Sequence, residues 1–353
     1  MINFSEGIEY ILRDIFHKGE IHMATLKDVA LKAGVSLTTA SYVINGKGNI
    51  SEKTAQKVLQ AANELGYISN KYPATDKSLM RKNIIGFATS NFKGPFFSEL
   101  LGYIEESAIS NGCLLVAYST AIISDRCSPK HIFETHKPNG LILTAYNISD
   151  KVLLKYSSAN FPIVTLDRKI EGDYIFSVTI DNFKGAYDIV KYLLECGHRE
   201  IAFMGGSYMT YETEMRYKGY CEALKEYGID PSSQIYCQGG RVIEGGYNTA
   251  KLLIAQNRIP EAMFCDNDEM AIGVMKACNE AGINIPEDLS LVGFDDISLA
   301  THVKPALTTV RQPIKEWANA AVQTLIMALH GSKTMKHLEL SPEVVVRESV
   351  KVK

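Results

Sequence analysis

Hydroxyl-bearing and aromatic side chains recur along one short segment near the start of the chain, at the spacing of an outward helix face. Thr38, Ser41 and Tyr42 can exchange hydrogen bonds with base edges, and Leu37 suits contact with thymine methyl groups. The hydroxyl of Ser36, at the expected start of the helix, suits a phosphate. A helix that packed against other protein would carry more bulky apolar residues on this face. The pattern therefore indicates a helix that reads a DNA groove.

Three short helices are expected in the first fifth of the chain. Thr25 is a good N-cap, Asp28 is its capping-box partner three residues later, and Gly34 ends the first helix. Ser36 and Ser51 are the expected N-caps of the second and third helices. The tight turn between the first two helices predicts a helix-turn-helix, whose second helix lies in the major groove.

The distribution of charge is consistent with this prediction. The 353-residue chain has a net charge of −3, yet residues 23–82 contain nine Lys or Arg against four Asp or Glu. A small basic module joined to a larger acidic body is typical of a protein in which only one part meets phosphates. A chance fluctuation of charge over this segment is the alternative.

From residue 83 the chain alternates apolar, strand-like runs with helical patterns such as 186–196 and 269–281. Buried parallel strands are predicted at residues 84–88, 114–117, 140–143, 163–166, 201–204, 262–265 and 289–294. This alternation predicts two doubly wound α/β lobes. Ligands of such sheets bind beyond the carboxyl ends of the strands, so the cleft between the lobes is the expected binding site.

Several classes of protein are not supported by the motifs. There is no G-x-G-x-x-G after the first strand, no Walker loop and no G-x-S-x-G elbow, so an enzyme is not expected. We interpret His198 as a surface or capping residue. The seven cysteines form no C-x-x-C pair, and no run of about 18 apolar residues occurs. A cytoplasmic protein with reduced thiols, no metal and no cofactor is expected.

Four segments resemble the DNA-binding headpiece of the lactose-repressor (LacI/GalR-type) family of bacterial transcription regulators: residues 25–30, 33–36, 41–45 and 66–70. The resemblance implies an all-α helix-turn-helix headpiece over residues 23–69, a hinge over 70–82 and an α/β body over 83–353. It also implies a repressor that binds a near-palindromic operator as a homodimer under the control of a small-molecule effector.

The body resembles the periplasmic-binding-protein fold that this family uses to bind effectors. The similarity lies in residues 178–182, 197–201, 267–271, 292–296 and 305–313. It implies crossovers between the lobes near residues 181, 311 and 340. Lobe one then comprises about 83–181 and 312–340, and lobe two about 182–311 and 341–353. No leucine heptad follows Val346, so a coiled-coil tetramer is not indicated.

One headpiece position departs from the family, because Tyr42 stands where most members carry an arginine that reads a base. We therefore expect an unusual operator, with a tyrosine contact in place of bidentate guanine recognition. The complete set of predicted DNA-binding residues is Thr25, Ser36, Leu37, Thr38, Ser41, Tyr42, Asn45, Lys53, Thr54, Lys77 and Leu79.

The hinge departs further. In the family a short helix wedges a leucine into the minor groove, but direct counting from Tyr67 places Asp76 there. A shift of three residues supplies Leu79 as the wedge and Lys77 as a basic residue close to it. We prefer this shifted hinge over a flexible linker without a wedge. Residues 1–22 precede the usual family start. Two interpretations are open: residues 1–22 form a short amphipathic helix, or the natural protein starts at Met23 and the start codon has been assigned too far upstream.

The resemblance also implies effector-binding residues: Phe96, Phe97, Asp167, Arg216, Arg241, Asn267, Asp295 and Gln312. Helix capping is the alternative for the acids, and we favour it for Asp268 and Asp296. Arg241 stands where sugar- and purine-responsive members place a stacking ring. Beside Arg216 it suits a phosphate or carboxylate, so a sugar or sugar phosphate is the expected effector. The alternative is that Arg241 lies on a solvated loop.

Two other functional classes remain open. The body alone would fit a solute-binding module. Tyr42 and the unusual hinge would fit a regulator that acts through a protein partner and binds DNA weakly.

Overall fold

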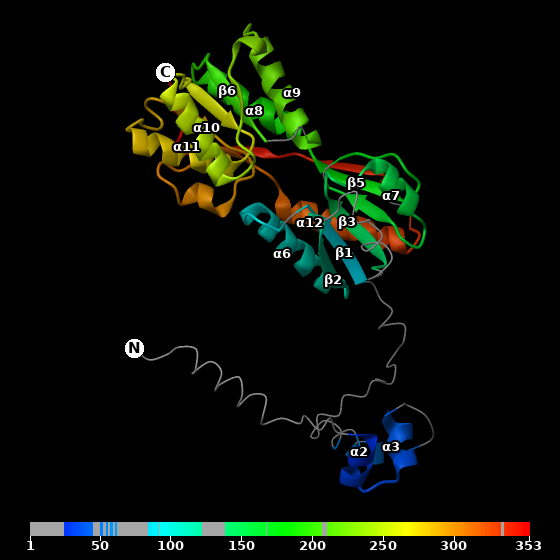
Figure 1. The fold of residues 1–353 in the computed structure, drawn as a ribbon. Coiled ribbons are helices and arrows are strands. Elements are labelled where there is room, and N and C mark those ends of the chain that lie inside the picture. The colour runs from blue at the N-terminus through cyan, green and yellow to red at the C-terminus, as the bar shows by residue number, and fades with distance from the viewer. Residues whose placement is uncertain are drawn as a thin grey trace, which may run out of the picture. The chain divides into compact units, whose positions relative to one another are not determined.

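The computed structural model describes residues 25–44, 50–51, 54–55, 57–58, 61, 84–90, 92–121, 138–166, 168–206, 210–332 and 335–353. The chain divides into two compact units, Met1–Lys82 and Asn83–Lys353, and each is considered by itself (Figure 1). The predicted N-terminal extension and hinge lie outside the described residues.

The first unit contains the predicted helix-turn-helix, formed by α2 (Leu26–Ala33) and α3 (Leu37–Ile44). The capping box is confirmed: the Thr25 hydroxyl accepts from the Asp28 N–H, and the Asp28 carboxylate accepts from the Thr25 N–H over 2.7 Å. Gly34 ends α2 with φ 67°, a left-handed conformation that favours glycine. Among the described residues of this unit, Val29, Ala30, Ala40, Val58 and Ala61 form a buried core.

The first lobe of the second unit has a six-stranded parallel sheet in the order β11-β5-β4-β3-β1-β2. The strands are β1 (Ile84–Thr89), β2 (Leu114–Ser119), β3 (Gly140–Thr144), β4 (Ile163–Thr165), β5 (Ile175–Ile180) and β11 (His337–Leu340). The helices of its described residues are α6 (Pro95–Ser110), α7 (Asp150–Tyr156) and α12 (Ile314–Leu329). Residues of α6 and α12 share one core with β1, β3, β4 and β5, which seals one face of the sheet.

The second lobe has a four-stranded parallel sheet in the order β7-β6-β8-β9. Its strands are β6 (Ile201–Gly205), β7 (Tyr236–Gln238), β8 (Ala262–Cys265) and β9 (Ser290–Val292). Its longer helices are α8 (Asn182–Glu195), α9 (Tyr211–Glu226), α10 (Ile243–Ala255) and α11 (Asp268–Ala281), with 3₁₀ turns η2 (Pro231–Ser233) and η3 (Ser298–Thr301). Two cores cover the two faces of the sheet. All seven predicted strands are confirmed, with ends that coincide or differ by one or two residues.

The chain passes between the two lobes after β5, after β10 (Thr309–Arg311) and after β11 (Figure 1). β10 pairs antiparallel with β12 (Glu343–Val345), which follows β11. The Asp181 N–H donates to the Leu340 carbonyl over 2.9 Å. These bonds hold the passages together, and each lobe is built from segments far apart in the sequence.

His198 is buried, with 1% of its surface exposed, so its interpretation as a surface residue is wrong. The C-terminal segment covers it: its Nε2 lies 3.0 Å from the Lys351 carbonyl, and the Lys353 N–H donates to the Cys196 carbonyl. Burial lowers the pKa of His198. Among the described residues, no helix has the length and apolar character needed to span a membrane.

Helices α8 and α9 approach closely at Gly219, and a substitution there tests this packing. A Cβ atom at Gly219 would lie 2.2 Å from the Phe183 carbonyl and 2.9 Å from the Tyr187 nitrogen. We expect Gly219→Ala to lower the free energy of unfolding of the body by about 1–3 kcal/mol, because backbone atoms cannot yield. Thermal and urea unfolding measure this change.

Gly102→Ala in α6 is the matched control, because a Cβ there meets no atom within 4 Å. In a helix interior this change should stabilise by about 0.5–1 kcal/mol. Equal effects of the two substitutions would contradict the packing of α8 against α9.

Candidate functional site

The outward face of α3 carries the predicted groove-reading residues. Leu37 is 52% exposed and Tyr42 is 46% exposed. Thr38 is also exposed, and Ser41 is half-buried. The buried Ala40 fixes this orientation by packing in the headpiece core. The helix therefore presents the Thr38 hydroxyl, the Tyr42 ring and the Leu37 side chain to solvent. Because α3 contains no Lys or Arg, the basic residues of the module lie outside this helix.

Three predicted DNA-binding residues take part in local caps. The Thr25 hydroxyl donates to the Asp28 carboxylate over 2.6 Å. The Ser36 hydroxyl oxygen accepts from the Thr39 N–H over 3.1 Å, and the Thr54 hydroxyl lies 2.8 Å from that of Ser51. Their contacts with DNA stay predictions. Asn45, Lys53, Lys77 and Leu79 lie outside the described residues.

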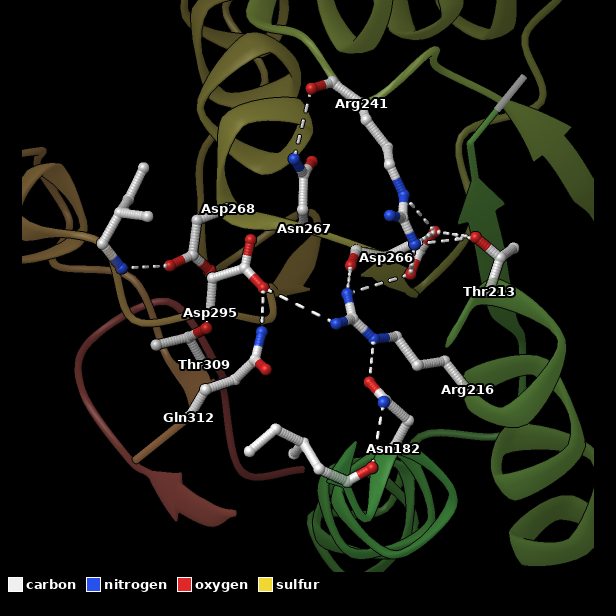
Figure 2. Close-up of polar contacts among 12 residues, drawn as sticks. Asn182, Thr213, Arg216, Arg241, Asp266, Asn267, Asp268, Asp295, Thr309 and Gln312 are labelled. Atoms are coloured by element: carbon white, nitrogen blue, oxygen red, sulfur yellow. Dashed lines mark hydrogen bonds and ion pairs between the residues drawn. The ribbon is translucent and has the colours of Figure 1, made fainter. Parts of the chain in front are cut away.

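A second cluster of polar side chains lies in the second lobe, around the carboxylate of Asp266 at the end of β8 (Figure 2). Asp266 is fully buried and accepts a hydrogen bond from the Thr213 hydroxyl over 2.7 Å. Two guanidinium groups face it: Arg216 Nη1 lies 3.1 Å from Oδ1, and Arg241 Nη2 lies 3.2 Å from Oδ2. Burial would raise the pKa of Asp266, but Arg241 and Arg216 hold this pKa below its usual value.

Arg216, which α9 supplies, is 4% exposed and makes several contacts inside the protein. Its Nε donates to Asn182 Oδ1 over 2.8 Å, its Nη1 donates to the Asp266 carbonyl, and its Nη2 lies 3.7 Å from Asp295 Oδ1. Its guanidinium carbon lies 3.6 Å from the centre of the Phe294 ring, a cation–π contact. Most of its hydrogen-bonding capacity is therefore used inside the protein.

Arg241 follows β7 and has φ 59°, an unusual left-handed conformation for a residue other than glycine. Its Nη2 donates to the Thr213 hydroxyl over 2.8 Å, and its carbonyl accepts from Asn267 Nδ2 over 3.3 Å. Its side chain is 32% exposed. The alternative that Arg241 lies on a solvated loop is wrong, because its guanidinium is paired with the buried Asp266.

Two predicted caps are wrong. Asn267 rather than Asp268 caps α11, since Asn267 Oδ1 accepts from the Met270 N–H. Asp268 is fully buried and accepts from the Ile297 N–H over 2.9 Å and from the Thr309 hydroxyl over 2.5 Å. Asn267, one residue earlier, already occupies the capping position and leaves Asp268 to hold these two more distant segments. Burial, together with the charge of Asp295, raises the pKa of Asp268 well above its usual value.

Asp296 caps no helix. Its carboxylate pairs with Arg311 over 2.6 Å and with Arg347 over 2.5 Å. The 3₁₀ turn that follows, η3, starts at Ser298, and its N-cap residue is Ile297, which makes no side-chain cap. The two arginines come from distant parts of the chain, which is why the local pattern misled the prediction.

Asp295 lies at the other end of the cluster, with φ 113° and 7% of its surface exposed. Its Oδ1 accepts from Gln312 Nε2 over 2.6 Å. Burial raises the pKa of Asp295 to about 7, although the charges of Arg216 and Arg241 oppose this increase. The structure thus brings Arg216, Arg241, Asn267, Asp295 and Gln312 together as one network.

The first lobe contributes the start of α6. Phe96 is half-buried, and its ring centre lies 5.4 Å from that of Phe97 and 6.4 Å from that of Trp317. A Cβ at Gly94 would lie 2.4 Å from Glu269 Oε1 in α11, so this end of α6 faces the second lobe. Asp167 lies outside the described residues.

The sequence predictions missed Asn182, Thr213 and Asp266. Asp266 directly follows the apolar run 262–265, so the strand-end rule that selected Asn267 could also have found it. Asn182 and Thr213 carried no comparable signal. Their roles depend on Arg216 and Asp266, which are distant in sequence.

Two family descriptions match the chain. Residues 25–70 match "Bacterial regulatory proteins, lacI family", and residues 190–350 match "Periplasmic binding protein-like domain". The repressor PurR of Pasteurella multocida is 31% identical over 333 residues, 93% of this chain and 99% of that relative. The regulator DegA of Bacillus subtilis is 35% identical over 333 residues, 92% of this chain and 97% of that relative.

Two solved structures of LacI-family regulators superpose on this chain. The lac repressor dimer bound to operator and the anti-inducer ONPF superposes with a TM-score of 0.74 at 26% identity, over 93% of this chain and 99% of that one. A LacI-family regulator from Enterococcus faecium with bound ribose gives 0.70 at 26% identity, over 76% of this chain and 99% of that one.

A helix-turn-helix joined to a two-lobed, periplasmic-binding-protein-like body is the architecture of one class of bacterial transcription regulators. The likeness to PurR and DegA extends over both parts of this architecture. The chain belongs to the LacI family of helix-turn-helix transcriptional regulators and is not an enzyme.

The raised pKa of Asp295 predicts a pH dependence of stability. Its folded-state pKa of about 7 exceeds its usual 3.8, so the folded protein keeps a proton that the unfolded chain loses between these values. The stabilisation that protonated Asp295 contributes is fully present below about pH 4 and is lost as the pH rises through about 7. We expect Asp295→Asn to reduce the loss of stability between pH 5 and pH 8 by about 1–4 kcal/mol in urea unfolding.

Asp230→Asn is the control, because hydrogen bonds from Ser232 lower the pKa of the exposed Asp230. It should not reduce that loss. Identical pH profiles for wild type and Asp295→Asn would contradict the raised pKa.

Proposed function

We propose that this regulator is a homodimeric repressor whose two headpieces read the half-sites of a near-palindromic operator. It would act in the cytoplasm. The headpiece would comprise residues 23–69, followed by a hinge over 70–82. The effector-binding and dimerisation domain would comprise residues 83–353, with lobe one at about 83–181 and 312–340 and lobe two at about 182–311 and 341–353. The observation that carries the proposal is the exposed face of α3, formed by Leu37, Thr38 and Tyr42, in a LacI-type headpiece.

The relatives support the mode of action. PurR of Pasteurella multocida is a transcriptional repressor, and the lac repressor binds its operator as a dimer. Two headpieces on one dimer would engage half-sites on the same face of the duplex, which favours a near-palindromic sequence.

The effector would bind between the lobes, where polar groups of the second lobe lie at the carboxyl ends of its strands. Arg241, Asn267 and Asp295 offer a cation, an amide and an acid at this edge, and Phe96 and Phe97 lie at the end of α6 that faces it. Such a set suits the hydroxyl groups of a sugar or sugar phosphate. Bound ribose in the Enterococcus faecium regulator and cellobiose in CelR are consistent with this class of ligand.

Regulation would follow from linkage between the two sites. An effector that favours one arrangement of the lobes changes the spacing of the headpieces, and operator and effector affinities then change reciprocally by about 1–3 kcal/mol. An inducer would weaken operator binding and a co-repressor would strengthen it.

Substitutions on α3 test the reading of bases. We expect Thr38→Ala and Tyr42→Ala each to weaken operator binding by about 1–3 kcal/mol per lost base contact, with a smaller effect on unrelated DNA. Fluorescence anisotropy on the upstream region of the protein's own gene, against a scrambled duplex, measures both affinities.

Tyr174→Ala in the body is the matched control, because Tyr174 is 41% exposed, similar to Tyr42. It should leave both affinities unchanged. An equal loss on both duplexes would assign Thr38 and Tyr42 to phosphate contacts. No sequence preference in the wild type would favour a regulator that acts through a protein partner.

The salt dependence of binding gives a separate prediction. The basic module should release condensed counterions when it binds, so the logarithm of the affinity should fall linearly with the logarithm of salt concentration. With about six phosphate contacts, the affinity should decrease on the order of 10³-fold between 50 and 200 mM salt. A flat dependence in anisotropy titrations would contradict DNA binding by this module.

A further inference from the structure

The side chain of Arg241 lies across the carboxyl ends of two central strands of the second lobe. A Cβ at Gly206, directly after β6, would lie 3.2 Å from Arg241 Cγ and 3.3 Å from its Nε. The guanidinium then reaches Asp266, the residue after β8 (Figure 2). Ligands of parallel α/β sheets bind at this edge, so Arg241 occupies the position where a ligand of this lobe is expected.

Arg241 is held in place at both ends. Its backbone has φ 59°, which is costly for a residue with a side chain, and Asn267 donates to its carbonyl. Its guanidinium is bonded to Thr213 and Asp266. Local strain of this kind persists where the surroundings fix it and is concentrated at ligand sites. The guanidinium is therefore preorganised.

One edge of this guanidinium remains available. Nε and Nη2 of Arg241 donate to Asp266 and Thr213, whereas Nη1 donates to none of the residues that the structure describes. The side chain is 32% exposed, against 5% for that of Arg216. Arg216 Nη2 also makes no hydrogen bond to the described part of the chain, but its side chain is almost completely buried, so Arg241 is the more accessible of the two arginines to a ligand.

We propose that Arg241 determines the specificity of the effector site and that the effector carries an anionic group, a phosphate or a carboxylate, bound by Arg241 Nη1. This inference rests on the proposed function. A guanidinium donates from a planar fork that suits both kinds of oxyanion, and charge-assisted hydrogen bonds of this type are about twice as strong as neutral ones.

The charges around Arg241 leave room for an anion. The single carboxylate of Asp266 is shared by two guanidinium groups, so it balances only one of them. The pKa of Asp295 is raised to about 7 by burial, so this acid carries only part of its charge at neutral pH. Glu212 acts in the opposite direction, because its charge also stabilises the protonated form of Arg241 and raises the Arg241 pKa. Removal of Glu212 should therefore strengthen anion binding.

Inorganic phosphate is the simplest probe of this site. In thermal-shift and calorimetric titrations of the full-length protein, we expect phosphate to raise the Tm above that in chloride of equal ionic strength. Arg241→Gln should weaken phosphate binding about 10–100-fold, as expected for the loss of a charged hydrogen bond. Glu212→Gln should strengthen it. Arg258→Gln, which removes an exposed cation between α10 and β8, is the matched control and should have no effect.

Arg241→Gln also leaves the buried Asp266 with one partner fewer, so a second variant is needed. Arg241→Lys keeps a cation beside Asp266 and removes the planar fork with Nη1, so it should retain thermal stability and still bind phosphate more weakly than the wild type. Phosphate binding by Arg241→Lys at the wild-type affinity would overturn the proposal, since Arg241 Nη1 would then not be the group that binds the anion. The absence of any phosphate-specific shift in the wild type would overturn it as well.

Matched sugars separate the two oxyanions. Glucose, glucose 6-phosphate and glucuronate differ in one substituent, and at least one of the two anions should bind the wild type more tightly than glucose. A neutral sugar that binds wild type and Arg241→Gln equally and changes operator affinity would overturn the anionic effector and leave the proposed function standing. If no compound changes either the Tm or operator affinity, the effector part of the proposed function fails too.

Discussion

The buried carboxylate of Asp266 is the interaction on which the second lobe's polar cluster depends. A fully buried anion is costly unless charges and hydrogen bonds surround it, and here two guanidinium groups and a hydroxyl do so. These partners come from α9 and from the segment between β7 and α10, so one carboxylate joins three parts of the lobe. Removal of one charged partner from such a group costs about 3–5 kcal/mol, because the remaining charge stays buried.

From Asp266 the contacts extend to the passages between the lobes. Arg216 bonds to Asn182, which lies at the first passage, and approaches Asp295, which bonds to Gln312 at the second. The third passage is joined to the first by the bond between Asp181 and Leu340. A ligand at Arg241 would therefore meet a network that already contacts the segments on which any motion between the lobes depends.

The described fold of the headpiece depends mainly on local interactions. Five buried residues form a core within the part of the headpiece that the structure describes, and its two described helices are set by local caps and a left-handed glycine. What remains exposed on α3 is free for recognition. Local sequence thus specifies the headpiece, which would bind DNA. Long-range polar contacts hold together the body, which would control that binding.

The sequence by itself determined the elements whose causes are local. The capping box at Thr25, the turn at Gly34 and seven of the described strands follow from neighbouring residues and were predicted correctly, whereas β5, β7, β10, β11 and β12 were not predicted. The resemblance to the LacI family also selected Arg216, Asn267, Asp295 and Gln312, whereas their contacts with an effector remain predictions.

Only the tertiary structure decided how the polar side chains are paired. Asp268 holds Thr309, Asp296 pairs with Arg347, and the C-terminal segment covers His198. In each case the partner is at least 41 residues away in sequence. An acid or a histidine has several partners of comparable strength open to it, and the packing of the lobes, rather than the local pattern, brings one of them within reach.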